Sequence, residues 1–151
     1  MKLIDFGNFE KEAHINFKNK SLLIQAFTHR SYLNEHPKEV LYHNERLEFL
    51  GDAVLELVVT EYLFEKYPDK NEGDLTSYRA ALVNTTMLAE VAYGLHMNDF
   101  LLLSKGESQD TGKARQYILA NTLESLIGAL YLDQGYIAVR DFLAHYLFPH
   151  L

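Results

Sequence analysis

The stretch HNERLEFLGDAVL at residues 43–55 decides how this chain folds. It belongs to a longer segment whose apolar residues repeat with a helical period, which we predict to be one helix from about residue 41 to residue 66. Apolar side chains surround most of this helix, so we expect it to lie centrally in the fold. Glu45, Glu48 and Asp52 are spaced i, i+3, i+7 and therefore share one stripe of the helix.

A second apolar segment complements the first. We predict a helix over residues 114–132, which carries Asn121 and Glu124 at i, i+3. With Gly51 on the first helix and Gly128 on the second, the two helices can cross closely and bring their oxygen ligands together. Acids on central helices are costly unless they are paired or bound to cations. Hard oxygen ligands in a chain without cysteine suit Mg²⁺ or Mn²⁺.

Other interpretations of these acids exist. The acids can form a solvated strip or pair with Arg46 and Lys66, and spacing alone favours this simpler interpretation. A di-iron carboxylate bundle would need Glu-x-x-His on its helices, and no glutamate here has a histidine three residues later. From these residues alone, the solvated strip and the metal site therefore both stay open.

The rest of the chain completes an all-α pattern. The further predictions are helices at 21–31, 75–93 and 137–146, a polar connection at 31–38 and a mobile surface loop at 104–113. Asp74 is the expected N-cap of the helix that begins at residue 75. Because no strand or hairpin pattern is present, we predict one all-α domain over residues 1–151.

Composition narrows the class of protein. The chain has 151 residues, 48% of them apolar, and no cysteine, which excludes disulfides and thiolate metal sites. We find no signal peptide and no apolar run near the about 18 residues that span a bilayer. We therefore expect a soluble cytoplasmic protein with no membrane partner. The net charge of −7 argues against a nucleic-acid partner, although bound cations would reverse the local sign.

Several motifs, in order along the chain, resemble those of the ribonuclease III family. Residues 43–55 match the family's signature, and LANTLESLIGA at residues 119–129 matches its second acidic motif. Supporting matches are AFTHRSY at 26–32, EGDL at 72–75 and RAALV at 79–83. The resemblance spans roughly residues 16–148. It implies the ribonuclease III endonuclease domain fold, assembled as a homodimer.

The resemblance also implies roles for individual residues. The implied metal ligands are Glu48, Asp52, Asn121 and Glu124, of which Asp52 and Glu124 are catalytic; Glu45 and Glu72 are supporting acids, and Phe49 inserts into the partner subunit. The simpler interpretation of Phe49 is a core residue, and His29 and Arg30 are expected to pair with acids and pack a helix end. The family usually has Asp where this chain has Asn121, so we expect weaker metal binding.

The implied activity is hydrolysis of double-stranded RNA, for example ribosomal RNA precursors and messenger RNA. Mg²⁺, with Mn²⁺ as a substitute, would support cleavage to 5′-phosphate and 3′-hydroxyl ends with short 3′ overhangs. The expected RNA contacts are Lys105, Lys113, Arg115 and Gln116, for which a solvated loop is an equal alternative. We expect no double-stranded RNA-binding domain in this chain. Asn121 also raises an alternative function, that of an inactive RNA-binding or structural relative.

Overall fold

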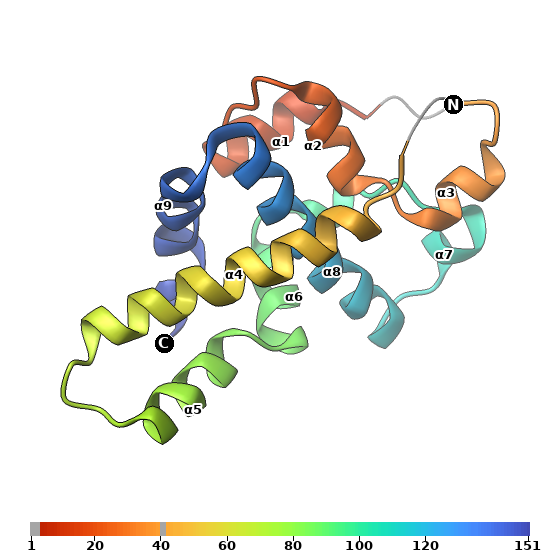
Figure 1. Cartoon of the computed structure of the whole chain (residues 1–151). Helices are drawn as coiled ribbons and strands as arrows, with labels where there is room; N and C mark the ends of the chain where they lie inside the picture. Colours follow the sequence, from red (N-terminus) through yellow and green to blue (C-terminus); the bar gives the residue numbers. More distant parts are fainter. Residues whose placement is uncertain (1–3, 40–41) are drawn as a thin grey trace.

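Two long helices cross at the centre of the molecule. The structure, a computed structural model, describes residues 4–39 and 42–151. In it, α4 (Glu45–Lys66) and α8 (Lys113–Gln134) make the most extensive helix–helix contact. Most of α8 is buried, whereas α4 buries one face and leaves the other exposed. Figure 1 shows α4 lying across α8. The two predicted central helices are therefore confirmed.

Facing glycines bring the backbones of α4 and α8 together. A Cβ atom on Gly51 would overlap the carbonyl oxygen of Glu124 and lie 2.6 Å from its carbonyl carbon. A Cβ atom on Gly128 would overlap the carbonyl oxygen of Leu47 and lie 3.1 Å from the Gly51 nitrogen. Only residues without a side chain permit this approach. Because Gly51 contacts the backbone of Glu124 and Asp52 is the next residue in α4, the crossing brings Asp52 close to Glu124.

The other helices surround this pair. They are α1 (Phe6–Ala13), α2 (Lys20–Phe27), α3 (Arg30–Glu35), α5 (Glu72–Leu82), α6 (Thr85–Gly94), α7 (Lys105–Gln109) and α9 (Tyr136–Tyr146), with 3₁₀ turns η1 (Met97–Phe100) and η2 (Phe148–His150). Helices α2, α6 and α9 pack on α8, and α5 packs on the far part of α4. The described ranges contain no β-strand, only an isolated bridge between Thr28 and Leu102, so the all-α prediction is confirmed. No helix within them has the length and apolar character to span a membrane.

One predicted helix is two helices. The segment predicted at residues 75–93 divides into α5 and α6, because Val83 and Asn84 leave helical geometry. The Asn84 side chain then accepts a hydrogen bond from the backbone N–H of Met87 at 2.9 Å and caps α6. The predicted N-cap is also wrong: Asn71, not Asp74, caps α5. Apolar residues continue across the break, which is why periodicity alone joined the two helices.

The segment before α4 was also predicted too simply. α2 ends at Phe27 because Thr28 is extended and pairs with Leu102. The predicted polar connection at 31–38 contains most of α3, and the predicted loop at 104–113 contains the short helix α7. The predicted start of the long helix at residue 41 lies outside the described residues, and α4 begins at Glu45.

Candidate active site

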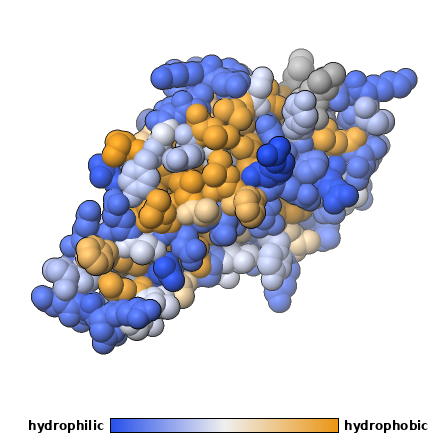
Figure 2. Space-filling model, in the orientation of Figure 1, coloured by the Kyte–Doolittle hydropathy of each residue, from blue (hydrophilic) through white to orange (hydrophobic). Residues whose placement is uncertain are grey.

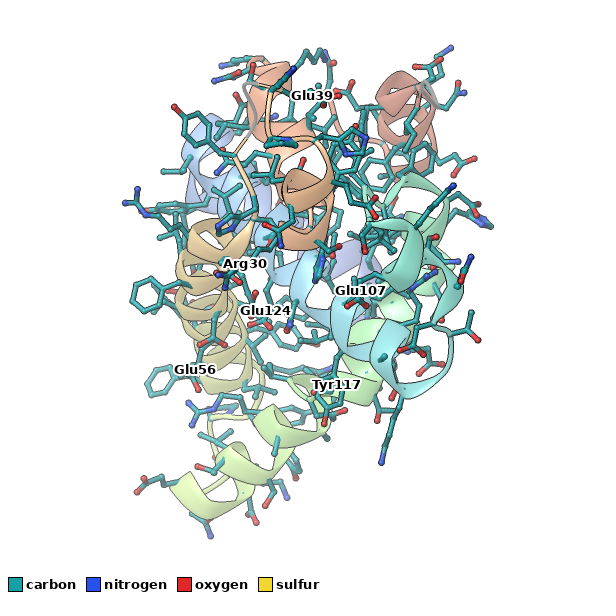
Figure 3. The ribbon with its side chains drawn as sticks, turned by 90° about the vertical axis from the view of Figure 1, so that its right-hand side faces the viewer. Arg30, Glu39, Glu56, Glu107, Tyr117 and Glu124 are labelled. Atoms are coloured by element: carbon teal, nitrogen blue, oxygen red, sulfur yellow. The ribbon has the colours of Figure 1, made fainter. Side chains whose placement is uncertain are left out.

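Carboxylates from α4 and α8 line one hollow beside the helix crossing. Its volume is about 600 Å³, and its lining residues are Glu45, Glu48, Phe49, Asp52, Asn121 and Glu124. Glu48 and Glu124 are half-buried, whereas Asp52 is exposed at the mouth. Five of the polar residues that the motifs singled out therefore meet in one place. In Figure 3, Glu124 lies beside α4, with Arg30 nearby.

The start of α4 is held in place by Asn44, which is buried. Its side-chain amide donates to the carbonyl oxygen of Ala26 at 3.0 Å, and its backbone N–H donates to that of Thr28. The hydroxyl of Ser125 on α8 donates to the Asn44 carbonyl at 3.1 Å. The first turn of α4, with Glu45 and Glu48, is thus fixed to both α2 and α8. Asn44 was not singled out from the sequence. The available indication was its position as an uncharged polar residue within residues 43–55, directly before the long helix.

Burial and mutual repulsion destabilise the charged forms of these acids. Burial, followed by the proximity of Asp52 and Glu48, raises the pKa of Glu124 from 4.5 to about 8. Burial also raises the pKa of Glu48, with further contributions from Glu45 and Asp52. Acids crowded in this way, with little positive charge between them, are a favourable environment for a cation.

The donor set fits a divalent cation of the hard, oxygen-binding type. Three carboxylates and the Asn121 amide, the only neutral oxygen donor of the four predicted ligands, face the hollow. Within the described part of the chain, no three histidine, aspartate or glutamate side chains converge closely enough to form a finished metal site. The hollow therefore offers the ligands without holding them in a closed cage.

A smaller cavity adjoins the hollow. It has a volume of about 80 Å³, and its lining residues are His29, Arg30, Asn44, Glu45, Glu48, Ile118, Asn121 and Thr122. The Arg30 guanidinium lies 3.9 Å from the Glu45 carboxylate, which confirms the expected pairing of Arg30 with an acid. His29 caps α3 by accepting a hydrogen bond from the Ser31 backbone N–H at 3.1 Å, as expected for a residue that packs a helix end.

The remaining predicted residues lie apart from the hollow. Glu72 is the first residue of α5, towards the end of the molecule that α4 reaches with its C-terminus (Figure 1). It does not line the hollow within this chain, and its supporting role stays a prediction. Lys105 and Lys113 are exposed, and Gln116 is half-buried. Their contacts with RNA also stay predictions.

Arg115 has a structural environment that the sequence did not reveal. Only 6% of its surface is exposed. Its guanidinium donates to the Asn98 side chain at 2.7 Å and to the carbonyls of Glu107 and Ser108 at 3.0 and 3.1 Å. Arg115 therefore ties the end of α7 and η1 to the start of α8. In this geometry its guanidinium is not available at the surface for a direct contact with RNA.

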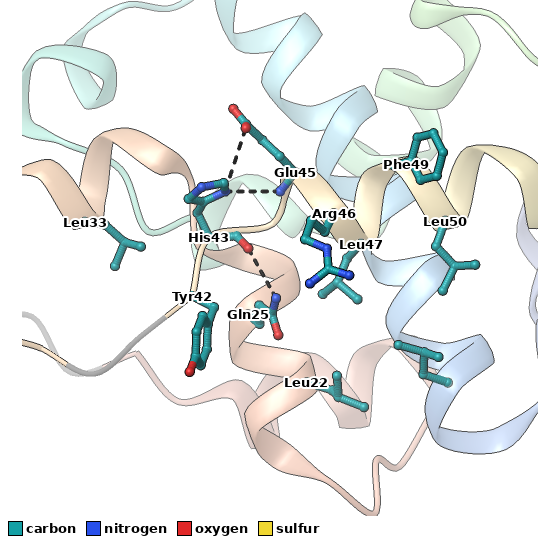
Figure 4. Close-up of a pocket in the computed structure, with 11 residues that line it drawn as sticks. Leu22, Gln25, Leu33, Tyr42, His43, Glu45, Arg46, Leu47, Phe49 and Leu50 are labelled. Carbon is teal, nitrogen blue, oxygen red and sulfur yellow. Dashed lines mark hydrogen bonds and ion pairs between the residues drawn. The ribbon is translucent and has the colours of Figure 1, made fainter.

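An apolar surface lies next to the acidic hollow. Phe49, Leu57 and Phe64 on the outer face of α4 are 84%, 57% and 71% exposed. Beside Phe49 is a cavity of about 790 Å³, whose apolar lining includes Leu22, Leu33, Leu47, Leu50 and Leu132. Figure 2 shows an apolar patch on this face, and Figure 4 shows the cavity at closer range. The interpretation of Phe49 as a core residue is wrong for the single chain, because α4 turns this side chain outward.

Comparisons with known proteins agree with this arrangement. A family model described as Ribonuclease-III-like matches residues 19–151. "Ribonuclease 3" of Bacillus velezensis is 50% identical over 99% of this chain, and that of Listeria monocytogenes is 51% identical over 94%. This chain covers 60% and 62% of those two proteins, so it spans about three fifths of the curated relatives that it matches.

Solved structures match the fold as well. The nuclease domain of ribonuclease III from Campylobacter jejuni superposes with a TM-score of 0.86 at 42% identity, over 96% of this chain and 99% of that one. That structure is described as having flexibility in a region involved in dimer formation. Dicer from Pichia stipitis matches with a TM-score of 0.62 at 28% identity, over 85% of this chain and 53% of that one.

Proposed function

The chain belongs to the ribonuclease III-like family, and from that premise we propose that it is an endonuclease that hydrolyses double-stranded RNA. The observation that carries the proposal is the hollow in which Glu48, Asp52 and Glu124 crowd together from two helices. Phosphodiester hydrolysis needs negative charge to be neutralised where it develops, and acids that gather cations meet this need. The products would be 5′-phosphate and 3′-hydroxyl ends with short 3′ overhangs.

Divalent cations are part of the proposal. Glu48, Asp52, Asn121 and Glu124 would hold Mg²⁺, for which Mn²⁺ can substitute. Bound there, the cation supplies charge neutralisation and a water of lowered pKa. The chain itself supplies three carboxylates that repel one another without a cation and one neutral amide oxygen. We therefore expect Asn121 to weaken cation binding without abolishing it, because the charge of one carboxylate is missing.

Exposed cationic side chains, of which Arg30 lines the cavity that adjoins the hollow, favour a duplex RNA substrate. The Arg30 side chain is 66% exposed, and Lys105 and Lys113 are exposed at α7 and at the start of α8. Phosphates of an RNA duplex are recognised by such groups largely without regard to sequence. Processing of ribosomal RNA precursors and messenger RNA in the cytoplasm is the expected setting. Gln116 would contribute a neutral contact, and Arg115 would act by holding α7.

We infer that two copies of the chain form the working enzyme. Phe49 and the cavity beside it lie on the same surface, so a two-fold axis would place the Phe49 of each copy in the cavity of the other. The apolar residues along α4 would be buried by the same contact. Such a dimer places two acidic hollows on one assembly, as cutting both strands of a duplex requires.

The test is cleavage of a long RNA duplex in Mg²⁺ or Mn²⁺, with single-stranded RNA and a DNA duplex as controls. We expect Glu124→Gln to abolish cleavage and Asn121→Asp to cleave at lower Mg²⁺ than the wild type. Glu90→Gln is the matched control, because Glu90 is an exposed glutamate of α6 outside the hollow.

One outcome would refute the enzyme. If the wild type and Asn121→Asp both leave the duplex intact while folding and dimerising, the chain is instead an RNA-binding or structural relative. The retained carboxylates in the hollow favour the enzyme, because a protein released from catalysis has no need to hold three unpaired acids together.

A further inference from the structure

His29 is connected to α7 by a short chain of hydrogen bonds. The backbone N–H of Ser104, the N-cap of α7, donates to the Ser31 hydroxyl oxygen at 2.9 Å. The same hydroxyl lies 2.7 Å from His29 Nδ1. Since its oxygen already accepts from Ser104, its proton is free to point at Nδ1. The backbone N–H of Ser31 also donates to Nδ1 at 3.1 Å.

These contacts determine which ring nitrogen of His29 carries the proton. A backbone N–H can only donate, so Nδ1 must present its lone pair, and the proton of the neutral ring is on Nε2. Burial lowers the pKa of His29, against the opposing effects of Glu107 and Glu45, and so favours the neutral form of the ring. The ring is thus a neutral donor with a fixed orientation.

The imidazole lies next to the acidic hollow. It lines the small cavity together with Glu45, Glu48 and Asn121, and these three residues also line the larger hollow. Among the described residues, Nε2 has no hydrogen-bond partner, whereas Nδ1 is engaged on the side of α3. A donor that is held in place and has no partner beside a proposed substrate site is available to a ligand.

We propose that His29 donates a hydrogen bond from Nε2–H to a phosphate oxygen of the RNA strand bound over the hollow. This inference rests on the proposed function. A neutral donor suits the position, because a positively charged ring would pair with Glu45 or Glu48 and compete with the cation for them. The Ser104–Ser31–His29 chain also couples this donor to α7, which carries Lys105. His29 is therefore a substrate-binding residue as well as the N-cap of α3.

The variant His29→Asn separates these two roles. Asparagine is a strong N-cap, and this chain already uses one in the same geometry: the Asn19 side chain accepts from the Ser21 N–H at 3.0 Å, two residues on, as His29 does with Ser31. Asparagine at position 29 would keep the cap, but its side chain is too short to replace Nε2–H. His29→Ala, which removes both the cap and the donor, is the comparison.

The experiment measures single-turnover cleavage of an RNA duplex at saturating Mg²⁺, with the melting temperature of each variant alongside. Because the cap is kept, we expect His29→Asn to melt like the wild type. Because a hydrogen bond to a charged group is lost, we expect it to cleave roughly 10- to 100-fold more slowly. The Mg²⁺ concentration for half-maximal rate should not change. Full activity in His29→Asn would overturn the inference and leave His29 as a cap only. A higher Mg²⁺ requirement with a normal saturating rate would also overturn it, because His29 would then act on the acids.

The tautomer can be checked without activity. Long-range ¹H–¹⁵N spectra of the wild-type chain should show a protonated Nε2 and an unprotonated Nδ1 for His29, and a protonated Nδ1 would overturn the inference even if no variant folds. If the wild type and Asn121→Asp both cleave no duplex while folding and dimerising, the proposed function is refuted. Equal cleavage by the wild type and His29→Asn would refute only the role of His29.

Discussion

The close crossing of α4 and α8 makes Gly51→Ala the most informative substitution. The added methyl group would lie 2.6 Å from the carbonyl carbon of Glu124 and 2.9 Å from the Gly128 nitrogen. Non-bonded carbon atoms prefer separations of about 3.5–4.0 Å, and the methyl group would also overlap the carbonyl oxygen of Glu124, so the helices would have to move apart by at least about 1 Å at this point. Backbone atoms of a second helix cannot rotate away as a side chain would. The crossing must therefore widen, or the helices must shift.

The cost of this substitution follows from two opposing effects. Overpacking against rigid backbone costs up to about 3 kcal/mol, and alanine returns about 1 kcal/mol through its better helix propensity. We expect a net loss of about 2 kcal/mol, which lowers the melting temperature of a chain of this length by roughly 4–8 °C. Because Asp52 and Glu124 flank the crossing, a displacement of about 1 Å should also reduce cleavage on the order of 100-fold.

Gly94→Ala is the matched control. Gly94 is the last residue of α6, it is exposed, and a Cβ atom there would meet nothing within 4 Å. Urea unfolding followed by circular dichroism, together with the duplex cleavage assay, should show Gly94→Ala unchanged and Gly51→Ala weakened in both respects. If Gly51→Ala unfolds at the wild-type urea concentration and cleaves normally, the backbone contact does not set the geometry of the hollow.

Three further predictions concern charge, the α7 anchor and assembly. Folding raises the pKa of Glu124 from 4.5 to about 8, so the folded chain holds this proton more tightly than the unfolded chain does. In EDTA, without divalent cations, the free energy of unfolding should therefore fall as the pH rises from 4.5 to about 8. The urea midpoint of Glu124→Gln should change less with pH than that of the wild type. Arg115→Met leaves two partly buried carbonyls without their donor and should cost about 2 kcal/mol of unfolding free energy. Lys113→Ala, at an exposed position, should change it by less than about 0.5 kcal/mol, and equal urea midpoints for the two variants would contradict the anchor. Phe49→Ala should leave the melting of the isolated chain intact but raise the dimer dissociation constant in analytical ultracentrifugation, and an unchanged constant would count against the inserted side chain.

Features that depend on local spacing were predictable from the sequence. Apolar periodicity located α4 and α8, although only α8 is buried around most of its surface, because the apolar side chains on the outer face of α4 are exposed. The same periodicity placed Glu45, Glu48 and Asp52 on one stripe, and the two glycines indicated a close crossing. Periodicity failed between α5 and α6, where Asn84 caps a new helix inside a continuous apolar pattern, because the apolar repeat does not register a local change of backbone geometry.

Other features were decided only by the tertiary structure. Arg115 belongs to a polar, charged segment and was predicted to be at the surface, but its contacts with Asn98 and the end of α7, which the fold of the connecting segment brings to the start of α8, bury it. The hydrogen-bond chain that ties His29 to α7 runs through Ser104, which lies 75 positions later in the sequence. The sequence by itself determined which residues carry the acidic oxygens, because helical spacing is a local property. Only the packing of segments remote in sequence determined how those oxygens meet, how their charge is balanced and which donors lie beside them.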